Sequence, residues 1–308
     1  MKDTTRRTVL KLAAAGAGAA AAAPVARPKK EVTTYVFVTG SNGGATADSE
    51  LALRGHRTVA VDLPGHALEG QFHRAYQAPQ DLKALATLKS PMAKVRLDDY
   101  VEAAVKVVRR VAGYGPVILV GGSLGGATIT KVADEVPDLI DTLVYDAAYC
   151  CTRLRSPNDY ATTPEGRTSL AASLVDGIVA DPSAIGAVRI NWRSANPKFL
   201  DAAKKAFMDE GSEGEFLALL NGLLPDESML VQGADARGRR DRWGRVRRVY
   251  IRHTKDRMIP VALQDRMIRE ADAATPGNRF RVFSVATSHA PTRQAYREIS
   301  EILHRLAK

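Results

Sequence analysis

The chain has 308 residues, of which 45% are hydrophobic and 25% charged, a balance that is ordinary for one large globular domain with an insertion. Its two cysteines, Cys150 and Cys151, are adjacent, which excludes a disulfide framework and a zinc site built from cysteines. A bridge between sequence neighbours would be strained, so we expect two buried or rim thiols, although an oxidising compartment leaves a vicinal bridge open.

The formal net charge is +10, and much of it lies in one stretch. Such a stretch can attract nucleic acid, an anionic surface or an acidic substrate, but it is more often a solvated face. No nucleic-acid motif or interleaved aromatic residues accompany it, so we predict no nucleic-acid partner. The arginines concerned are Arg237, Arg239, Arg240, Arg242, Arg245, Arg247, Arg248 and Arg252.

The first 26 residues have the plan of a twin-arginine export signal. Arg6 and Arg7 precede an uncharged, alanine-rich run that extends to Ala23 and Pro24. The run is too short and too rich in alanine for a transmembrane helix, so no stable membrane insertion is expected. An alanine-rich disordered tail is the alternative. The export interpretation predicts recognition by the twin-arginine machinery and a periplasmic or extracellular location.

Strands and helices alternate along residues 31–148, the predicted N-terminal part of the core. Such alternation favours an α/β fold with a mostly parallel sheet that helices cover on both faces. The predicted strands are 31–38, 57–63, a run from 117 to the glycines at 121, and 140–147; the predicted helices are a short one ending near 53, then 97–111 and 127–136.

The alternation stops at residues 149–244, which we interpret as an inserted helical cap. Its helix-like patches are 170–179, 198–207 and 215–224, separated by polar stretches. Residues 245–308 resume the core pattern with a strand at 248–252, a helix at 261–273, a strand at 279–285 and an amphipathic helix at 291–306.

The most informative motif is Gly121-Gly122-Ser123-Leu124-Gly125, a G-x-S-x-G nucleophile elbow between strand and helix. Ser123 must occupy a strained turn there, and side chains at Gly121 or Gly125 would clash with the crossing backbone. The Leu124 N–H would then face a developing oxyanion at the helix N-terminus. The alternative is a glycine-rich turn between strand and helix whose serine has no catalytic role.

A serine hydroxyl needs a base, and the base needs an orienting carboxylate. Among six histidines, His289 is favoured because it lies in the loop between the last predicted strand and the last helix. Asp256 follows a strand between the two in sequence, which gives the order serine, acid, histidine; Asp146 is the alternative acid. The second oxyanion donor is expected in the first loop, at the N–H of Ser41 or, next in line, Asn42.

These motifs together resemble an α/β-hydrolase over nearly all of the mature length, in particular the branch of plant methyl esterases, hydroxynitrile lyases and bacterial esterase relatives. Residues 38–45 read VTGSNGGA where that branch has V-H-G-A-x-x-G-A, and the resemblance continues through GHRTVAVDLPGH at 55–66, RWG at 242–244, YIR at 250–252 and DRMIP at 256–260. Thr39 and Gly122 depart from the usual histidines, which alters the pocket wall.

The resemblance implies a serine hydrolase that cleaves a small or medium-sized carboxylic ester through an acyl-enzyme, with no cofactor and no metal. Lactone and amide hydrolysis use the same machinery and stay open. A lyase is disfavoured, since Gly40 and Ala290 stand where the lyases carry threonine and lysine. A non-catalytic ligand-binding protein is disfavoured because the triad is intact. Specificity is expected to come from the cap.

Overall fold

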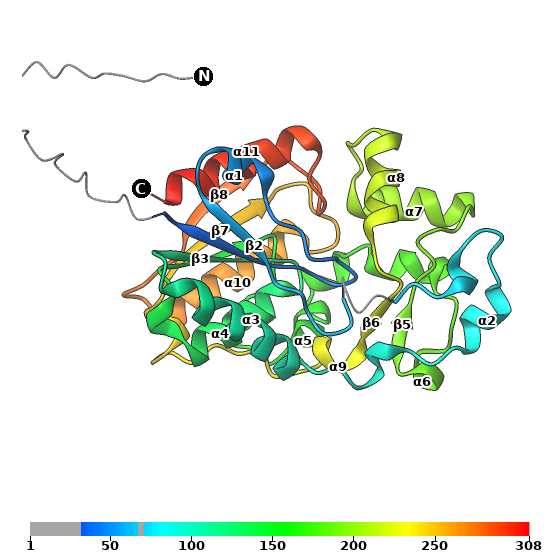
Figure 1. Ribbon diagram of the computed structural model, residues 1–308, viewed down its shortest axis with the longest axis horizontal. Coiled ribbons are helices and arrows are strands. Elements are labelled where there is room, and N and C mark those ends of the chain that lie inside the picture. Colours follow the sequence, from blue (N-terminus) through cyan, green and yellow to red (C-terminus); the bar gives the residue numbers. More distant parts are fainter. Residues whose placement is uncertain (1–31, 67–70, 308) are drawn as a thin grey trace, which may run out of the picture. The chain divides into compact units, whose positions relative to one another are not determined.

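The computed structural model describes residues 32–66 and 71–307. The export signal predicted at residues 1–26 lies outside this range and stays a prediction. Within it, the chain forms a layered core with a cap at one end (Figure 1).

The core is built on a parallel sheet, which in the described part of the chain has six strands in the order β2-β1-β3-β4-β7-β8. The predicted α/β fold with a mostly parallel sheet is therefore confirmed. The strands are β1 (Thr34–Val38), β2 (Arg57–Ala60), β3 (Val117–Gly122), β4 (Thr142–Asp146), β7 (Arg247–His253) and β8 (Arg281–Val285). Since all are parallel, their carboxyl ends share one edge, where the loops carrying Ser123, Asp256 and His289 begin.

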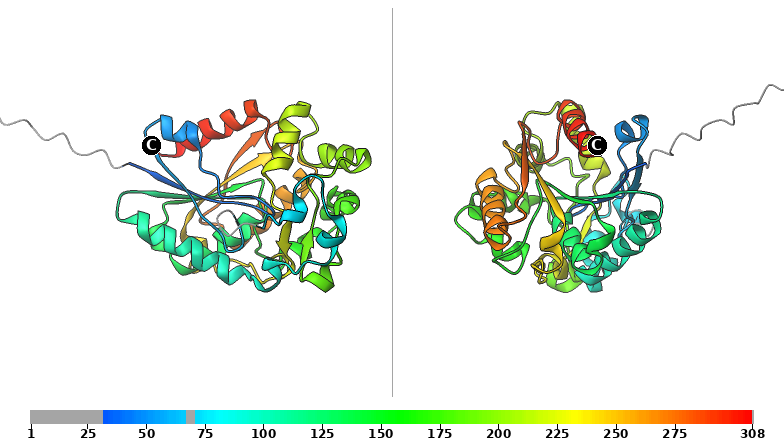
Figure 2. Two further views of the ribbon diagram at one scale, coloured as in Figure 1. Left: turned by 45° about the vertical axis from the view of Figure 1, so that its right-hand side comes forward. Right: turned by 90° about the vertical axis from the view of Figure 1, so that its left-hand side faces the viewer.

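Helices cover both faces of the sheet (Figures 1 and 2). One apolar cluster lies under α3 (Leu97–Ala112), α4 (Gly125–Glu135) and α10 (Val261–Ala274). The other lies under α1 (Ser49–Leu53) and α11 (Arg293–Leu306). The two clusters fix the sheet from both sides, so the strand ends form a rigid platform. Short 3-10 turns at Pro137–Leu139 (η4) and Trp243–Arg245 (η7) precede β4 and β7.

Helix α3 illustrates why these segments are helical. Its buried residues recur three or four apart and face the sheet, whereas acidic residues occupy its first turn and basic residues its last, as the helix dipole favours. Gly113 ends it. The buried positions are Leu97, Tyr100, Val101, Ala104, Val105 and Val108.

The region predicted as a helical cap contains helices but also a small antiparallel sheet that the sequence did not reveal. Strands β5 (Ala187–Arg189) and β6 (Asp226–Ser228) pair there; each has three residues, and β6 is entirely polar. The α-helix expected at 170–179 is wrong, because Ala171–Gly177 forms a 3-10 helix (η6). The helices are α5 (Pro157–Ala161), η5 (Gly166–Thr168), α6 (Pro182–Ile185), α7 (Pro197–Phe207), α8 (Glu213–Gly222) and α9 (Met229–Gln232).

A segment of the core sequence also joins the cap. Between β2 and α3, the chain forms η2 (Arg74–Tyr76), α2 (Leu82–Thr87) and η3 (Pro91–Lys94), and α2 lies beside the cap helices in Figure 1. Buried Arg189 of β5 ties the pieces together by donating to Asp226 at 2.6 Å and to the Leu85 carbonyl at 2.6 Å. The cap thus includes elements before residue 149.

The arginine-rich stretch is largely paired within the protein. Arg237 and Arg239 each bind an aspartate two residues away, and Arg245 binds Asp138 at 2.9 Å. Buried Arg248 stacks on Trp243 at 4.0 Å from the ring centroid. The ion pairs neutralise part of the positive charge that would otherwise attract an anionic partner.

The alanine-rich run at 9–23 lies outside the described residues, so the expectation that it does not insert into a membrane stays a prediction. Within residues 32–66 and 71–307, no helix is long and apolar enough to span a membrane. Cys150 and Cys151 are both buried free thiols, and burial raises the pKa of Cys150 to about 12.

Candidate active site

The nucleophile elbow has the strained geometry expected of it. Ser123 lies between β3 and α4 with φ +50°, a conformation that non-glycine residues rarely adopt. A Cβ added at Gly121 would lie 2.8 Å from the Gly125 carbonyl oxygen, and one at Gly125 would lie 2.5 Å from that of Val38. Both glycines are therefore required for the backbones to cross at this distance.

Three backbone hydrogen bonds hold Ser123 in this conformation, which costs roughly 1–3 kcal/mol. Its N–H donates to the Asp146 carbonyl at 3.3 Å, and its carbonyl accepts from Gly126 at 3.2 Å and Tyr149 at 3.0 Å. The end of β4 and the residues after it thus fix the serine.

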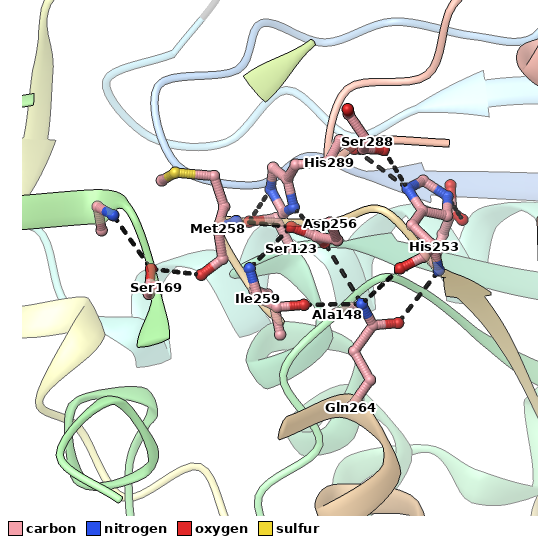
Figure 3. Close-up of polar contacts among 12 residues, drawn as sticks. Ser123, Ala148, Ser169, His253, Asp256, Met258, Ile259, Gln264, Ser288 and His289 are labelled. Atoms are coloured by element: carbon pink, nitrogen blue, oxygen red, sulfur yellow. Dashed lines mark hydrogen bonds and ion pairs between the residues drawn. The ribbon is translucent and has the colours of Figure 1, made fainter. Parts of the chain in front are cut away.

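The fold brings Ser123, His289 and Asp256 together from three distant parts of the chain (Figure 3). His289 Nε2 lies 3.1 Å from Ser123 Oγ, and His289 Nδ1 lies 2.7 Å from Asp256 Oδ2. The His289 side chain is only 11% exposed and that of Asp256 is fully buried. The imidazole therefore bridges the hydroxyl and the carboxylate, as the chemistry of an activated serine requires.

Asp256 is held in a turn between β7 and α10. Its Oδ1 accepts hydrogen bonds from the backbone N–H groups of Met258 at 2.7 Å and Ile259 at 2.8 Å. Buried Gln264 of α10 braces the same turn by donating to the Ile259 carbonyl at 2.7 Å. One carboxylate oxygen is thus fixed by the backbone, which leaves the other directed at His289.

Asp146, the alternative acid, does not contact His289. It lies at the end of β4, where its Oδ1 is 3.0 Å from Nε2 of His253, a buried histidine at the end of β7. Each of the two carboxylates therefore contacts a different histidine: Asp146 contacts His253, and Asp256 contacts His289. The His253 contact was not foreseen from the sequence, since it joins residues 107 positions apart.

The first loop approaches the nucleophile closely at Gly40. A Cβ added there would lie 2.6 Å from the Ser123 Cβ, so only glycine leaves room for the serine. Ser41 follows in the loop, and Leu124 follows Ser123 at the start of α4. The N–H of Asn42, in contrast, already donates to Glu227 Oε2 at 2.9 Å.

Glu227 anchors this loop to the cap. Its carboxylate accepts from Asn42 N–H, from the Tyr100 hydroxyl at 3.0 Å and from the Ser228 N–H at 2.9 Å, and Tyr100 contacts His66 at 2.7 Å. Burial raises the pKa of Glu227, while the nearby His66 and the hydrogen bonds oppose this. Asn42, at φ +57°, is thus locked between β6 and the core.

The loop that carries His289 is also held by the cap. Glu210, between α7 and α8, accepts a hydrogen bond from the Ser288 N–H at 2.7 Å and another from the Ser288 hydroxyl. The Ala290 N–H donates to the Phe207 carbonyl at 2.8 Å. No local sequence pattern signals these contacts, because they join segments that are far apart in the chain. The cap thus positions both sides of the site.

One aromatic side chain of the cap borders the imidazole, and a second packs against the first. The Phe207 ring lies 6.1 Å from that of His289, and Trp192 lies 5.8 Å from Phe207, centroid to centroid. Met258 and Ala290 pack against the same apolar cluster. The surroundings of His289 on this side are apolar.

A separate surface cavity of about 400 Å³ adjoins the His289 loop and is lined by Asp209, Glu210, Lys255, Arg257 and Ser288. Its charged lining differs from the apolar side of the site. In the described parts of the chain, no group of three or more histidine, cysteine or acidic side chains is arranged to hold a metal ion.

Residues 35–302 match the model of the alpha/beta hydrolase family, and the chain belongs to that family. The family prediction made from the elbow and the first-loop motifs is therefore confirmed.

Three relatives illustrate the similarity. The pyrethroid hydrolase of Sphingobium wenxiniae is 25% identical over 272 residues, which cover 84% of this chain and 82% of the relative. The solved pyrethroid hydrolase from Sphingobium faniae has a TM-score of 0.65 and 22% identity, covering 90% of this chain and 97% of the other. A methylesterase from Arabidopsis has a TM-score of 0.59 and 18% identity, covering 90% and 99%. Methyl esterases belong to the branch predicted from the sequence.

Proposed function

We propose that the protein is a serine carboxylesterase acting through Ser123, His289 and Asp256. The observation that carries this proposal is the continuous contact from Ser123 Oγ to His289 Nε2, at 3.1 Å, and from His289 Nδ1 to Asp256, at 2.7 Å. The relatives named as hydrolases and esterases support the same reaction class.

In the proposed reaction, His289 takes the Ser123 proton while Oγ attacks the ester carbonyl carbon. The tetrahedral intermediate collapses, the alcohol leaves with the proton from His289, and an acyl-serine forms. Water, deprotonated by His289, then attacks the acyl carbon; the bond to Ser123 Oγ breaks, the acid leaves, and His289 returns the proton to Oγ. Asp256 holds the imidazole in the tautomer with its proton on Nδ1 and stabilises the imidazolium.

The oxyanion is assigned to the N–H groups of Leu124 and Ser41. Removing one such donor costs about 3–4 kcal/mol of transition-state stabilisation in comparable sites. Asn42 is left out of this assignment because its N–H already binds Glu227. Its role is to hold the loop beside Ser41.

The proposed substrate is a small or medium-sized ester with an apolar acyl or alcohol group. Phe207 beside His289, with Trp192 packed against Phe207, favours an apolar group in this position. The same machinery hydrolyses lactones and amides. A lyase is disfavoured because Gly40 and Ala290 stand where the lyases carry threonine and lysine.

The test is hydrolysis of p-nitrophenyl acetate, butyrate and octanoate by wild type, by Ser123→Ala and by Ser183→Ala, which removes an exposed hydroxyl of α6. Labelling by a fluorophosphonate runs in parallel. We expect turnover and labelling in wild type and Ser183→Ala, and neither in Ser123→Ala. Labelling without ester turnover would shift the assignment to lactones or amides. Absence of both would contradict a serine hydrolase.

Residues 1–26 are proposed to direct export through the twin-arginine route, supported by Arg6-Arg7 and the alanine-rich run. Replacing both arginines by lysine is expected to retain the chain in the cytoplasm of a bacterial host, whereas the unaltered signal exports it. Equal export of both versions would contradict the proposal.

A further inference from the structure

The ring of His253 lies between Asp146, at the end of β4, and the loop that carries His289. The side chain is only 1% exposed. Nδ1 lies 2.9 Å from the Ser288 carbonyl oxygen and 3.2 Å from that of His289 (Figure 3). Nε2 lies 3.0 Å from Asp146 Oδ1. His253 thus links the end of β4 to the loop that carries the proposed base.

The hydrogen-bond partners of the His253 ring determine which of its nitrogens carry a proton. A carbonyl oxygen only accepts hydrogen bonds, so Nδ1 must donate, and an ionised carboxylate also only accepts, so Nε2 must donate as well. A histidine that donates from both nitrogens is an imidazolium. With no free lone pair, this ring cannot serve as a general base.

The charges around the ring agree with this state. Burial alone would lower the pKa of His253, but the charges of Asp146 and Asp256 and the hydrogen bonds to Asp146 and Ser288 outweigh it and raise the pKa. Helix α10 faces the residue with neutral Gln264, which binds the His253 backbone N–H and carbonyl, each at 3.2 Å. The His289 loop presents its carbonyls.

We propose that His253 is a cationic positioning residue that fixes the His289 loop against the end of β4, and thereby aligns His289 with Ser123. Asp146, at the end of β4, contacts both Ser123 and His253. Its backbone carbonyl accepts a hydrogen bond from the Ser123 N–H, and its side chain binds His253. This inference rests on the proposed function of His289 as the base. It also gives Asp146 a role other than that of a triad acid.

Two substitutions separate positioning from simple packing. Asparagine places its amide nitrogen at the δ position, where Nδ1 stands, and can still donate to the loop carbonyls. Glutamine places its amide nitrogen at the ε position and keeps only the donor toward Asp146. We expect His253→Asn to retain kcat within about threefold and His253→Gln to lose about tenfold or more, with KM within about twofold for both, since small misplacements of a catalytic group affect mainly the chemical step.

The matched control is His304→Gln, in the last turn of α11, where the side chain contacts His56. Circular dichroism establishes that each variant is folded. If His253→Asn and His253→Gln have equal kcat, or if both match wild type, the positioning role is wrong. Using the rate of fluorophosphonate labelling of Ser123 as a second readout keeps the test independent of the ester chosen.

The charge is tested without any substrate. In wild-type protein labelled with ¹⁵N-histidine, the spectrum at about pH 7 should contain a signal from an imidazole with protons on both nitrogens that is absent from the spectrum of His253→Asn. Asp146→Asn, which keeps an acceptor but removes the charge, should lower the pKa of His253, so that the doubly protonated signal disappears at a lower pH than in wild type. A neutral His253 ring in the spectrum would overturn the cationic assignment even if the protein proved not to be an esterase.

Discussion

The N–H of Ala290 donates a 2.8 Å hydrogen bond to the carbonyl of Phe207, the last residue of α7. This contact ties the residue after His289 to the cap, and Glu210 holds the residue before it. The cap therefore positions the proposed base as well as bordering it. Changes in the cap are expected to alter kcat as well as substrate preference.

Replacing Glu210 by alanine should lower kcat about tenfold, because it frees the Ser288 end of the His289 loop. Glu213→Ala, in the exposed first turn of α8, is the matched control. Steady-state kinetics on a p-nitrophenyl ester provide the measurement. A Glu210→Ala enzyme with wild-type kcat would mean that the Phe207 contact suffices.

The Glu210 contact also has a pH dependence. Burial alone would raise the pKa of Glu210, but the hydrogen bonds from Ser288 outweigh it and hold the pKa below its ordinary value of 4.5. A lowered folded-state pKa gives stability that is present above the unfolded value and lost as the pH falls through the folded one. Urea unfolding of wild type and Glu210→Ala should therefore differ most near neutral pH and converge as the pH falls below 4.5 and through the lowered folded-state pKa of Glu210.

The elbow glycines should respond differently to an added methyl group. Gly125→Ala places a Cβ 2.5 Å from the Val38 carbonyl oxygen, whereas at Gly122 the nearest atom is the Asp146 carbonyl oxygen at 3.9 Å. We expect Gly125→Ala to lose more than about 3 kcal/mol of unfolding free energy, and Gly122→Ala less than about 1 kcal/mol. Equal losses in urea unfolding would contradict the close approach of β1 and α4 at Gly125.

Asp256→Asn should lower kcat by about 10⁴-fold, the magnitude that removal of the orienting carboxylate has in a comparable triad. Asp146 does not compensate, because its side chain binds His253. Asp146→Asn should lower kcat at neutral pH less than about tenfold. If the two variants showed the reverse order, Asp146 would be the acid and the assignment of Asp256 would fail.

Asn42 should tolerate glycine better than valine. Both substitutions remove the side-chain hydrogen bond to the Leu224 carbonyl at 2.8 Å, but only glycine adopts φ +57° without strain. We expect Asn42→Val to be less stable than Asn42→Gly by about 1–2 kcal/mol in urea unfolding. Indistinguishable stabilities would show that the loop relaxes.

Several parts of the fold and site followed from local sequence. The helix predicted at 97–111 forms as Leu97–Ala112, because its apolar residues recur at helical spacing. The predicted clash at Gly125 is present, because the crossing of strand and helix at an elbow is a local steric requirement. The strands of the cap could not be predicted from the sequence, because β5 and β6 have three residues each and are too short to show an alternating pattern.

The identity of Ser123 as the elbow serine and the chain order serine, acid, histidine could be read from residue spacing, because backbone strain and strand ends depend on near neighbours. The sequence already favoured Asp256 over Asp146 as the acid. The contact of Asp256 with His289, the pairing of Asp146 with His253, and the attachment of the loops to Glu210 and Glu227 required the folded chain. Each joins side chains that are far apart in sequence and meet only where parallel strands end at one edge of the sheet, so no local pattern encodes them.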